Sequence, residues 1–229
     1  MLLLAVDTSG KNGSLALARV ASGQSEIQVL ETMPLTGGAF SAQLVPLIAM
    51  LLEKHGHSKS DLGAFAVVRG PGSFTGLRVG LAAIKGLAEA LDKPIAAVSL
   101  LEAVARGSDS RAHVLAALDA GRGDVYVGDY ELAPEACMHS ERLLSREELI
   151  AEAKSKSKSE EKLVVTPDDA LAEILRAADI RVEVIEYPQG AVIARLGWEH
   201  FQRGQTVHPE DLEANYIRHS DAEIFAKDR

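Results

Sequence analysis

The chain of 229 residues is 47% hydrophobic and 25% charged, the composition of an ordinary globular protein with room for one large domain or two modest lobes. Its formal net charge of −9 at pH 7 disfavours long-range attraction to nucleic-acid phosphates as a primary role. The single cysteine, Cys137, excludes an internal disulfide, and without a Cys-His signature around it we expect a buried or half-buried apolar residue.

The first residues predict a buried strand rather than a targeting segment. Residues 2–6 are apolar, lack a basic leader and stop at Asp7, so we expect no signal peptide, no membrane span and a cytoplasmic location. Two further strands are predicted at 13–20 and 27–33, with polar turns between them.

The segment from Ser41 to Gly56 has the pattern of an amphipathic helix. Its apolar face collects Phe40, Leu44, Leu47, Ile48 and Leu51. Further apolar residues flank this face, which makes the stripe wider than packing on one sheet requires. We therefore expect part of it to be exposed to a partner.

A glycine-rich stretch from Arg69 to Gly80 lies between an apolar run and a helical pattern over 77–91. Ser73 or Thr75 can cap this helix. Gly76 and Gly80 lie in successive turns of it, and each glycine costs about 1 kcal/mol relative to alanine, so we expect close approach of another helix or of a ligand. The stretch matches neither common phosphate-binding motif, which favours a tight strand-to-helix turn over a phosphate cradle.

The rest of the chain alternates strands and helices, which predicts an α/β fold with mixed sheets covered by helices. The expected strands are 64–68, 94–98, 113–118, 125–130, 163–165 and 182–185, and the expected helices are 99–106, one starting at Ser145, 168–178 and 191–202. We place an N-terminal lobe at 1–98 and a C-terminal lobe at 99–229, with helix 191–203 in the second lobe or packed back on the first. The Lys- and Ser-rich tract 154–162 is interpreted as a solvated loop or frayed helix end.

Four segments of the chain resemble the TsaB (YeaZ) family: 69–80 above all, then 4–9, 118–126 and 215–218. This family belongs to the glycoprotease-like group of the actin-like ATPase superfamily. The resemblance implies a two-lobed actin-like (ASKHA, RNase H-like) fold. It also implies a non-catalytic partner of TsaD in making threonylcarbamoyladenosine beside the anticodon of tRNA, joined by TsaE, without a cofactor. Contact with tRNA would come only through the complex.

The resemblance further implies that the helix at 41–56 and the helix after the glycine-rich turn form the docking face. That face would bind TsaD, or a second copy of the chain when TsaD is absent. We expect it to contain Leu44, Leu47, Ile48, Leu51, Gly76, Leu77 and Gly80. Enlarging Gly80 would then abolish docking and leave the monomer folded.

Residues at two places match the phosphate-handling positions of actin-like ATPases and are weak nucleotide-binding candidates: Asp7, Thr8, Ser9, Asp119 and Gly121. The alternative is that Asp7 and Ser9 satisfy turn amides. The adenosine loop of such ATPases has no counterpart, because only one glycine precedes the last helix. An ATP-binding protein or ATPase therefore remains the alternative function.

Metallopeptidase chemistry is disfavoured by the spacing of the histidines. No two of the seven lie four residues apart, as a helical metal site would need, and His113 and His139 are among those scattered along the chain. We expect neither a metal site nor a catalytic residue.

Overall fold

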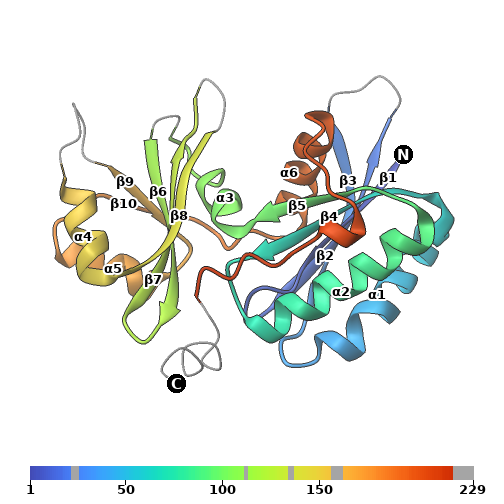
Figure 1. The fold of residues 1–229 in the computed structure, drawn as a ribbon, viewed down its shortest axis with the longest axis horizontal. Helices are drawn as coiled ribbons and strands as arrows, with labels where there is room; N and C mark the ends of the chain where they lie inside the picture. Colours follow the sequence, from blue (N-terminus) through green and yellow to red (C-terminus); the bar gives the residue numbers. More distant parts are fainter. Residues whose placement is uncertain (22–25, 111–112, 134–136, 156–161, 219–229) are drawn as a thin grey trace. The chain divides into compact units, whose positions relative to one another are not determined.

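The computed structural model describes residues 1–21, 26–110, 113–133, 137–155 and 162–218. The chain divides into two units (Figure 1). The first contains Met1–Leu100 and Pro188–Tyr216, and the second contains Leu101–Tyr187 and Ile217–Arg229. Each unit is built on its own five-stranded sheet.

The first sheet is mixed, with the strand order β3-β2-β1-β4-β5. Its strands are β1 (Leu2–Asp7), β2 (Gly13–Val20), β3 (Ile27–Leu35), β4 (Leu62–Gly70) and β5 (Ile95–Ser99). The first three strands form an antiparallel meander, while β4 runs parallel to both β1 and β5. Every residue of the central strand β1 is buried, which explains why its sequence is a continuous apolar run.

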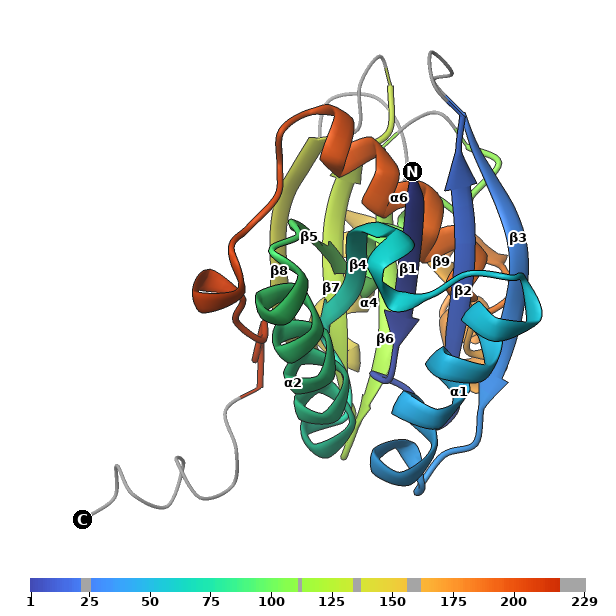
Figure 2. The same ribbon diagram turned by 90° about the vertical axis from the view of Figure 1, so that its right-hand side faces the viewer.

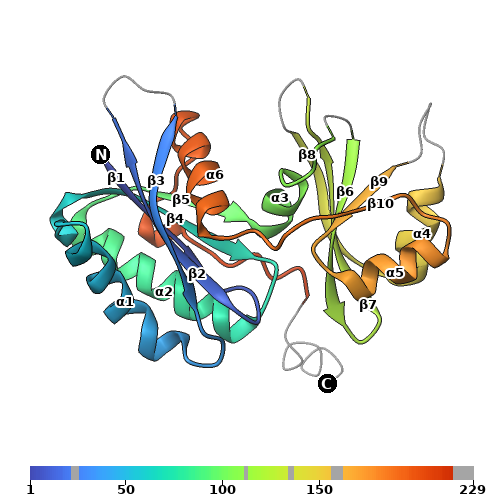
Figure 3. The same cartoon turned by 180° about the vertical axis from the view of Figure 1, so that it is seen from behind.

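Three helices cover the two faces of this sheet (Figures 2 and 3). On one face lie α1 (Phe40–Lys54) and α2 (Phe74–Leu91), which also contact each other. On the other face lies α6 (Gly190–Gln202), which touches all five strands. A Cβ atom on Gly197 of α6 would lie 2.3 Å from the Cβ atom of Ala66 on β4, so this helix sits unusually close to the sheet.

The second sheet has the order β10-β9-β6-β7-β8. Its strands are β6 (His113–Gly121), β7 (Asp124–Glu131), β8 (Cys137–Ser145), β9 (Leu163–Thr166) and β10 (Val182–Val184). One face carries α4 (Arg146–Lys154) and α5 (Asp169–Ala177), whose apolar residues form a core with Leu115, Val125 and Val127. The short helix α3 (Leu100–Ala105) approaches the opposite face, where a Cβ atom on Gly128 would lie 3.0 Å from Leu101.

The predicted α/β class with mixed, helix-covered sheets is confirmed. The strand β8 was not predicted, and the expectation of a buried or half-buried Cys137 was wrong, because this residue is exposed at the start of β8. Residues 156–161 of the Lys- and Ser-rich tract lie outside the described part of the chain. The lobe boundary near residue 98 stays a prediction about independent domains.

Within the described ranges, none of the helices combines the length and the apolar character that crossing a membrane would require.

Candidate functional site

The turn after β1 lies against the start of α2 in the first unit. The Thr8 hydroxyl donates a 2.7 Å hydrogen bond to the Gly76 carbonyl oxygen, and the amide of Ser73 donates one of 2.7 Å to the Ser9 carbonyl oxygen. Asp7 accepts hydrogen bonds from the Ser9 amide and hydroxyl at 2.8 and 2.5 Å. All three residues of the turn are at most 2% exposed, so α2 covers the turn.

The glycines of this stretch allow that contact. A Cβ atom would lie 2.4 Å from the Ser9 carbonyl oxygen at Gly72, 2.1 Å from the Thr8 carbonyl oxygen at Gly76, and 2.3 Å from the Thr8 hydroxyl at Gly80. Gly70 also has a φ of +131°, a conformation that favours glycine. The neighbour that requires Gly76 and Gly80 is therefore the β1 turn, and the expectation of another helix or a ligand was wrong. Enlarging Gly80 would disturb the monomer itself, contrary to expectation.

The candidate nucleotide residues are engaged in contacts within their own units. Asp7, Thr8 and Ser9 form the buried turn, and their hydrogen bonds fit the alternative in which they satisfy turn amides. In the second unit, Asp119 forms an ion pair of 3.2 Å with Arg146, and the Gly121 carbonyl oxygen accepts a hydrogen bond from Arg218. A nucleotide role for these residues stays a prediction.

The expected docking residues mostly anchor the two helices on the sheet. Leu44, Ile48, Leu51 and Leu77 are between 0 and 4% exposed, and Gly76 and Gly80 are buried as well. Of the expected set only Leu47 is half-buried. The other members are buried within the unit, and their role as a docking face stays a prediction. Helical periodicity identifies the apolar face of a helix, and the most apolar residues of that face pack on the sheet.

A different set of small and apolar residues lies on the exposed sides of the same helices. Val45 and Met50 of α1 are 58% and 46% exposed. We define the helical face as the exposed residues Ala42, Val45, Ala49 and Met50 of α1 and Ala82, Gly86 and Ala90 of α2. The set excludes the exposed Glu53 and Glu89 of the same helices, and its small and apolar side chains suit an apolar partner surface.

The segment before Arg218 runs along the start of α2. The guanidinium of Arg78 lies 3.7 Å from the centre of the Phe74 ring and donates a 3.2 Å hydrogen bond to the Tyr216 hydroxyl. The Phe74 and Tyr216 rings are 4.9 Å apart, and the Asn215 amide donates to the Arg69 carbonyl oxygen at 2.7 Å. This segment therefore fixes the outer side of the glycine-rich stretch.

Arg218 braces the hairpin between β6 and β7 in the second unit. It donates to the Ala120 carbonyl oxygen at 2.8 Å and forms an ion pair with Asp124. The Tyr-Ile-Arg motif thus uses its tyrosine in one unit and its arginine in the other.

Sequence reasoning missed one cluster in the second unit. His113 and His139, which are 26 positions apart in the sequence, both lie close to Asp129. Their proximity depends on β8 and on a bulge in its pairing with β7, and no sequence pattern indicated either.

Comparison with known proteins gives consistent matches. The family model described as "TsaD: tRNA N6-adenosine threonylcarbamoyltransferase" matches residues 34–175. The tRNA threonylcarbamoyladenosine biosynthesis protein TsaB of Escherichia coli K12 is 28% identical over 227 residues, 96% of each chain. The protein of that name from Bacillus subtilis 168 is 36% identical over 132 residues, which is 57% of this chain and 56% of that one.

Solved structures agree with these matches. YeaZ from Pseudomonas aeruginosa superposes with a TM-score of 0.74 and 27% identity, covering 94% of this chain and 99% of that one. The ethanolamine utilization protein EutJ from Carboxydothermus hydrogenoformans gives a TM-score of 0.50 at 14% identity over 86% of this chain and 88% of that one, which bears on the fold alone. Together they confirm the actin-like, RNase H-like fold class.

Proposed function

Because the chain belongs to the TsaD family of tRNA N6-adenosine threonylcarbamoyltransferases, and within it to the TsaB (YeaZ) proteins, we propose that it is a non-catalytic scaffold subunit in tRNA threonylcarbamoyladenosine biosynthesis. The Escherichia coli relative that matches 96% of its length is named for that pathway. In the proposed role the chain holds a TsaD-type transferase in an active arrangement, and the transferase performs the chemistry.

The helical face is the observation that carries this proposal. Two adjacent helices, α1 and α2, each expose small or apolar residues on the side away from their buried leucines. Small residues let a helix of another subunit approach closely, and Val45 and Met50 supply apolar area that would leave water on binding. The buried leucines below keep the two helices in place.

The proposed partners follow from the same surface and from charge. The TsaD-type transferase binds the helical face, and a second copy of the chain occupies it when the transferase is absent. TsaE joins the assembled pair. A chain with a formal charge of −9 would repel tRNA, so tRNA is held by the other subunits, in the cytoplasm.

Gly86 offers a sharper test of docking than Gly80. No described atom lies within 4 Å of a Cβ atom placed on Gly86, so a larger residue fits the monomer there. Gly86→Glu adds a charge to the helical face and improves helix propensity. We expect the variant to be at least as stable as the parent and its affinity for the TsaD-type transferase of the same genome to fall tenfold or more.

The matched control is Ala151→Glu, which adds the same charge at an exposed position of α4 in the second unit. Binding is measured by calorimetry on the purified chains, and tRNA modification is measured after reconstitution with the transferase and TsaE. We expect Ala151→Glu to bind and support modification like the parent. Met50→Glu is a second single variant of the helical face. Normal binding by both Gly86→Glu and Met50→Glu would refute docking through this face.

A further inference from the structure

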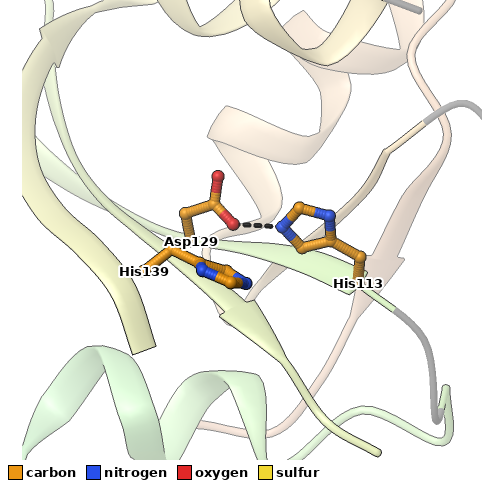
Figure 4. A group of neighbouring side chains, drawn as sticks. All are labelled: His113, Asp129 and His139. Carbon is orange, nitrogen blue, oxygen red and sulfur yellow. Dashed lines mark hydrogen bonds and ion pairs between the residues drawn. The ribbon is translucent and has the colours of Figure 1, made fainter. Parts of the chain in front are cut away.

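Three potential metal-ligand side chains meet at one end of the second sheet. His113 comes from β6, Asp129 from β7 and His139 from β8, and the two imidazoles and the carboxylate lie close together (Figure 4). One ligand atom from each residue lies within 4.8 Å of the other two. The His113 Nε2 atom is hydrogen bonded to Asp129 Oδ1, and the two imidazole rings stand edge to face with their centres 5.4 Å apart.

Strand pairing explains how residues so distant in sequence converge. Leu115 pairs with Asp129, so His113, two residues earlier, projects from the same face of the sheet. Between β7 and β8 the register shifts: Asp129 pairs with Ser140 and Tyr130 with Met138, which leaves His139 as the extra residue of a bulge. A bulge redirects the side chain that it inserts, and here His139 is brought beside Asp129.

Asp129 is buried, and its carboxyl group is held in place by hydrogen bonds with two neighbours, His113 and Lys162. Lys162 donates to Oδ2 at 3.1 Å, which fixes the carboxylate and turns Oδ1 toward the imidazoles. Such a bond to the distal oxygen is how ligating carboxylates are commonly oriented.

We propose that His113, Asp129 and His139 form a binding site for a divalent transition-metal ion of the zinc type. Two imidazole nitrogens and one carboxylate oxygen are a donor set that zinc accepts, with one position left open. Donor atoms around a tetrahedral zinc ion lie roughly 3.4 Å apart, so the three side chains need only small rotations to enclose an ion. Glu131, whose Oε2 is 3.6 Å from His139 Nε2, is placed to orient that imidazole or to supply a fourth ligand.

The competing interpretation is a purely structural brace in which Asp129 holds His113 and Lys162 without any metal. Under that interpretation His139 contributes little, because its side chain is 47% exposed and its nearest charged partner, Glu131, is 53% exposed. The metal site instead requires His139 as a ligand. The effect of replacing His139 therefore separates the two interpretations, and its exposure means that the replacement leaves the fold intact.

The test uses the full chain without a polyhistidine tag, freed of metal by a chelator. Zinc binding is measured by calorimetry, and cobalt is added as a spectroscopic probe because tetrahedral coordination gives strong visible absorption. We expect one equivalent of zinc to bind and His139→Ala to weaken binding at least tenfold. His208→Ala, a histidine of the first unit outside the cluster, should bind like the parent.

Equal zinc affinity in the parent and His139→Ala, or no saturable binding by the parent, would overturn the proposal. The cobalt spectrum provides an independent reading, since loss of the tetrahedral bands in His139→Ala reports coordination rather than stability. None of these outcomes depends on docking of a partner.

Discussion

The Thr8 hydroxyl donates a hydrogen bond to the carbonyl oxygen of Gly76, a residue 68 positions later. This contact joins the first turn of the chain to the first turn of α2, and the absence of a side chain at Gly76 makes it possible. The glycine-rich stretch is therefore part of the internal packing of the first unit. Its outer side is covered in turn by Asn215 and Tyr216.

Replacing Gly76 should destabilise the monomer. In Gly76→Ala the new Cβ atom would lie 2.1 Å from the Thr8 carbonyl oxygen, and neither backbone can move away without strain, so we expect a loss of roughly 1–3 kcal/mol. Gly86→Ala is the matched control in the same helix, and we expect it to gain up to about 1 kcal/mol. Urea unfolding followed by circular dichroism measures both. Equal stability of the two variants would contradict the packing described for Gly76.

The contribution of Glu31 to stability should depend on pH. Hydrogen bonds from Lys54 at 2.7 Å and from His55 at 2.8 Å hold the pKa of Glu31 below its ordinary value of 4.5. A carboxyl group with a lowered pKa in the folded state stabilises fully above the unfolded pKa and loses this contribution as pH falls through the folded pKa. Glu31→Gln should therefore be less stable than the parent near neutral pH, and the difference should disappear in acid.

Unfolding free energies measured from about pH 7 down to about pH 3 test this expectation. Glu26→Gln, at an exposed glutamate just before the same strand, is the control and should follow the parent throughout. A difference between Glu31→Gln and the parent that persists unchanged into acid would show that the charge of Glu31 is not the cause.

Nucleotide binding gives a third prediction. Because Asp7, Thr8 and Ser9 are covered by α2, we expect no saturable heat when ATP and Mg²⁺ are titrated into the protein. The informative variant is Asp119→Ala, since Asp119 is exposed and its loss removes only a surface ion pair with Arg146. Saturable binding that Asp119→Ala weakens would favour the ATP-binding alternative.

Local sequence patterns predicted the helices and strands well where an apolar run or a capping residue marks the element. β2 was predicted with its observed bounds, and Ser73 and Ser145 cap their helices as expected. In contrast, β8 carries polar, half-exposed residues without an apolar run, so nothing in its sequence distinguishes it from a loop. Because β8 was not predicted, the cluster at Asp129 was not predicted either, since His139 lies beside Asp129 only when β8 pairs with β7.

The docking residues show a different limit. A helix as apolar as α1 has several candidate faces, and spacing alone does not tell which one the sheet will cover. Leu44 and Leu51 are buried against the sheet, whereas Val45 and Met50 are exposed. Burial in the structure, and not the period of the sequence, decides which residues are free to meet a partner.

The position of α6 has a consequence for synthesis of the protein. All five strands of the first sheet are made within the first hundred residues, yet the helix that covers one of their faces ends at Gln202. A nascent chain emerging from the ribosome would therefore expose the apolar face of the first sheet that α6 later covers, for as long as the second unit is being translated. Chaperones that shield such surfaces would have to remain bound until that last helix arrives.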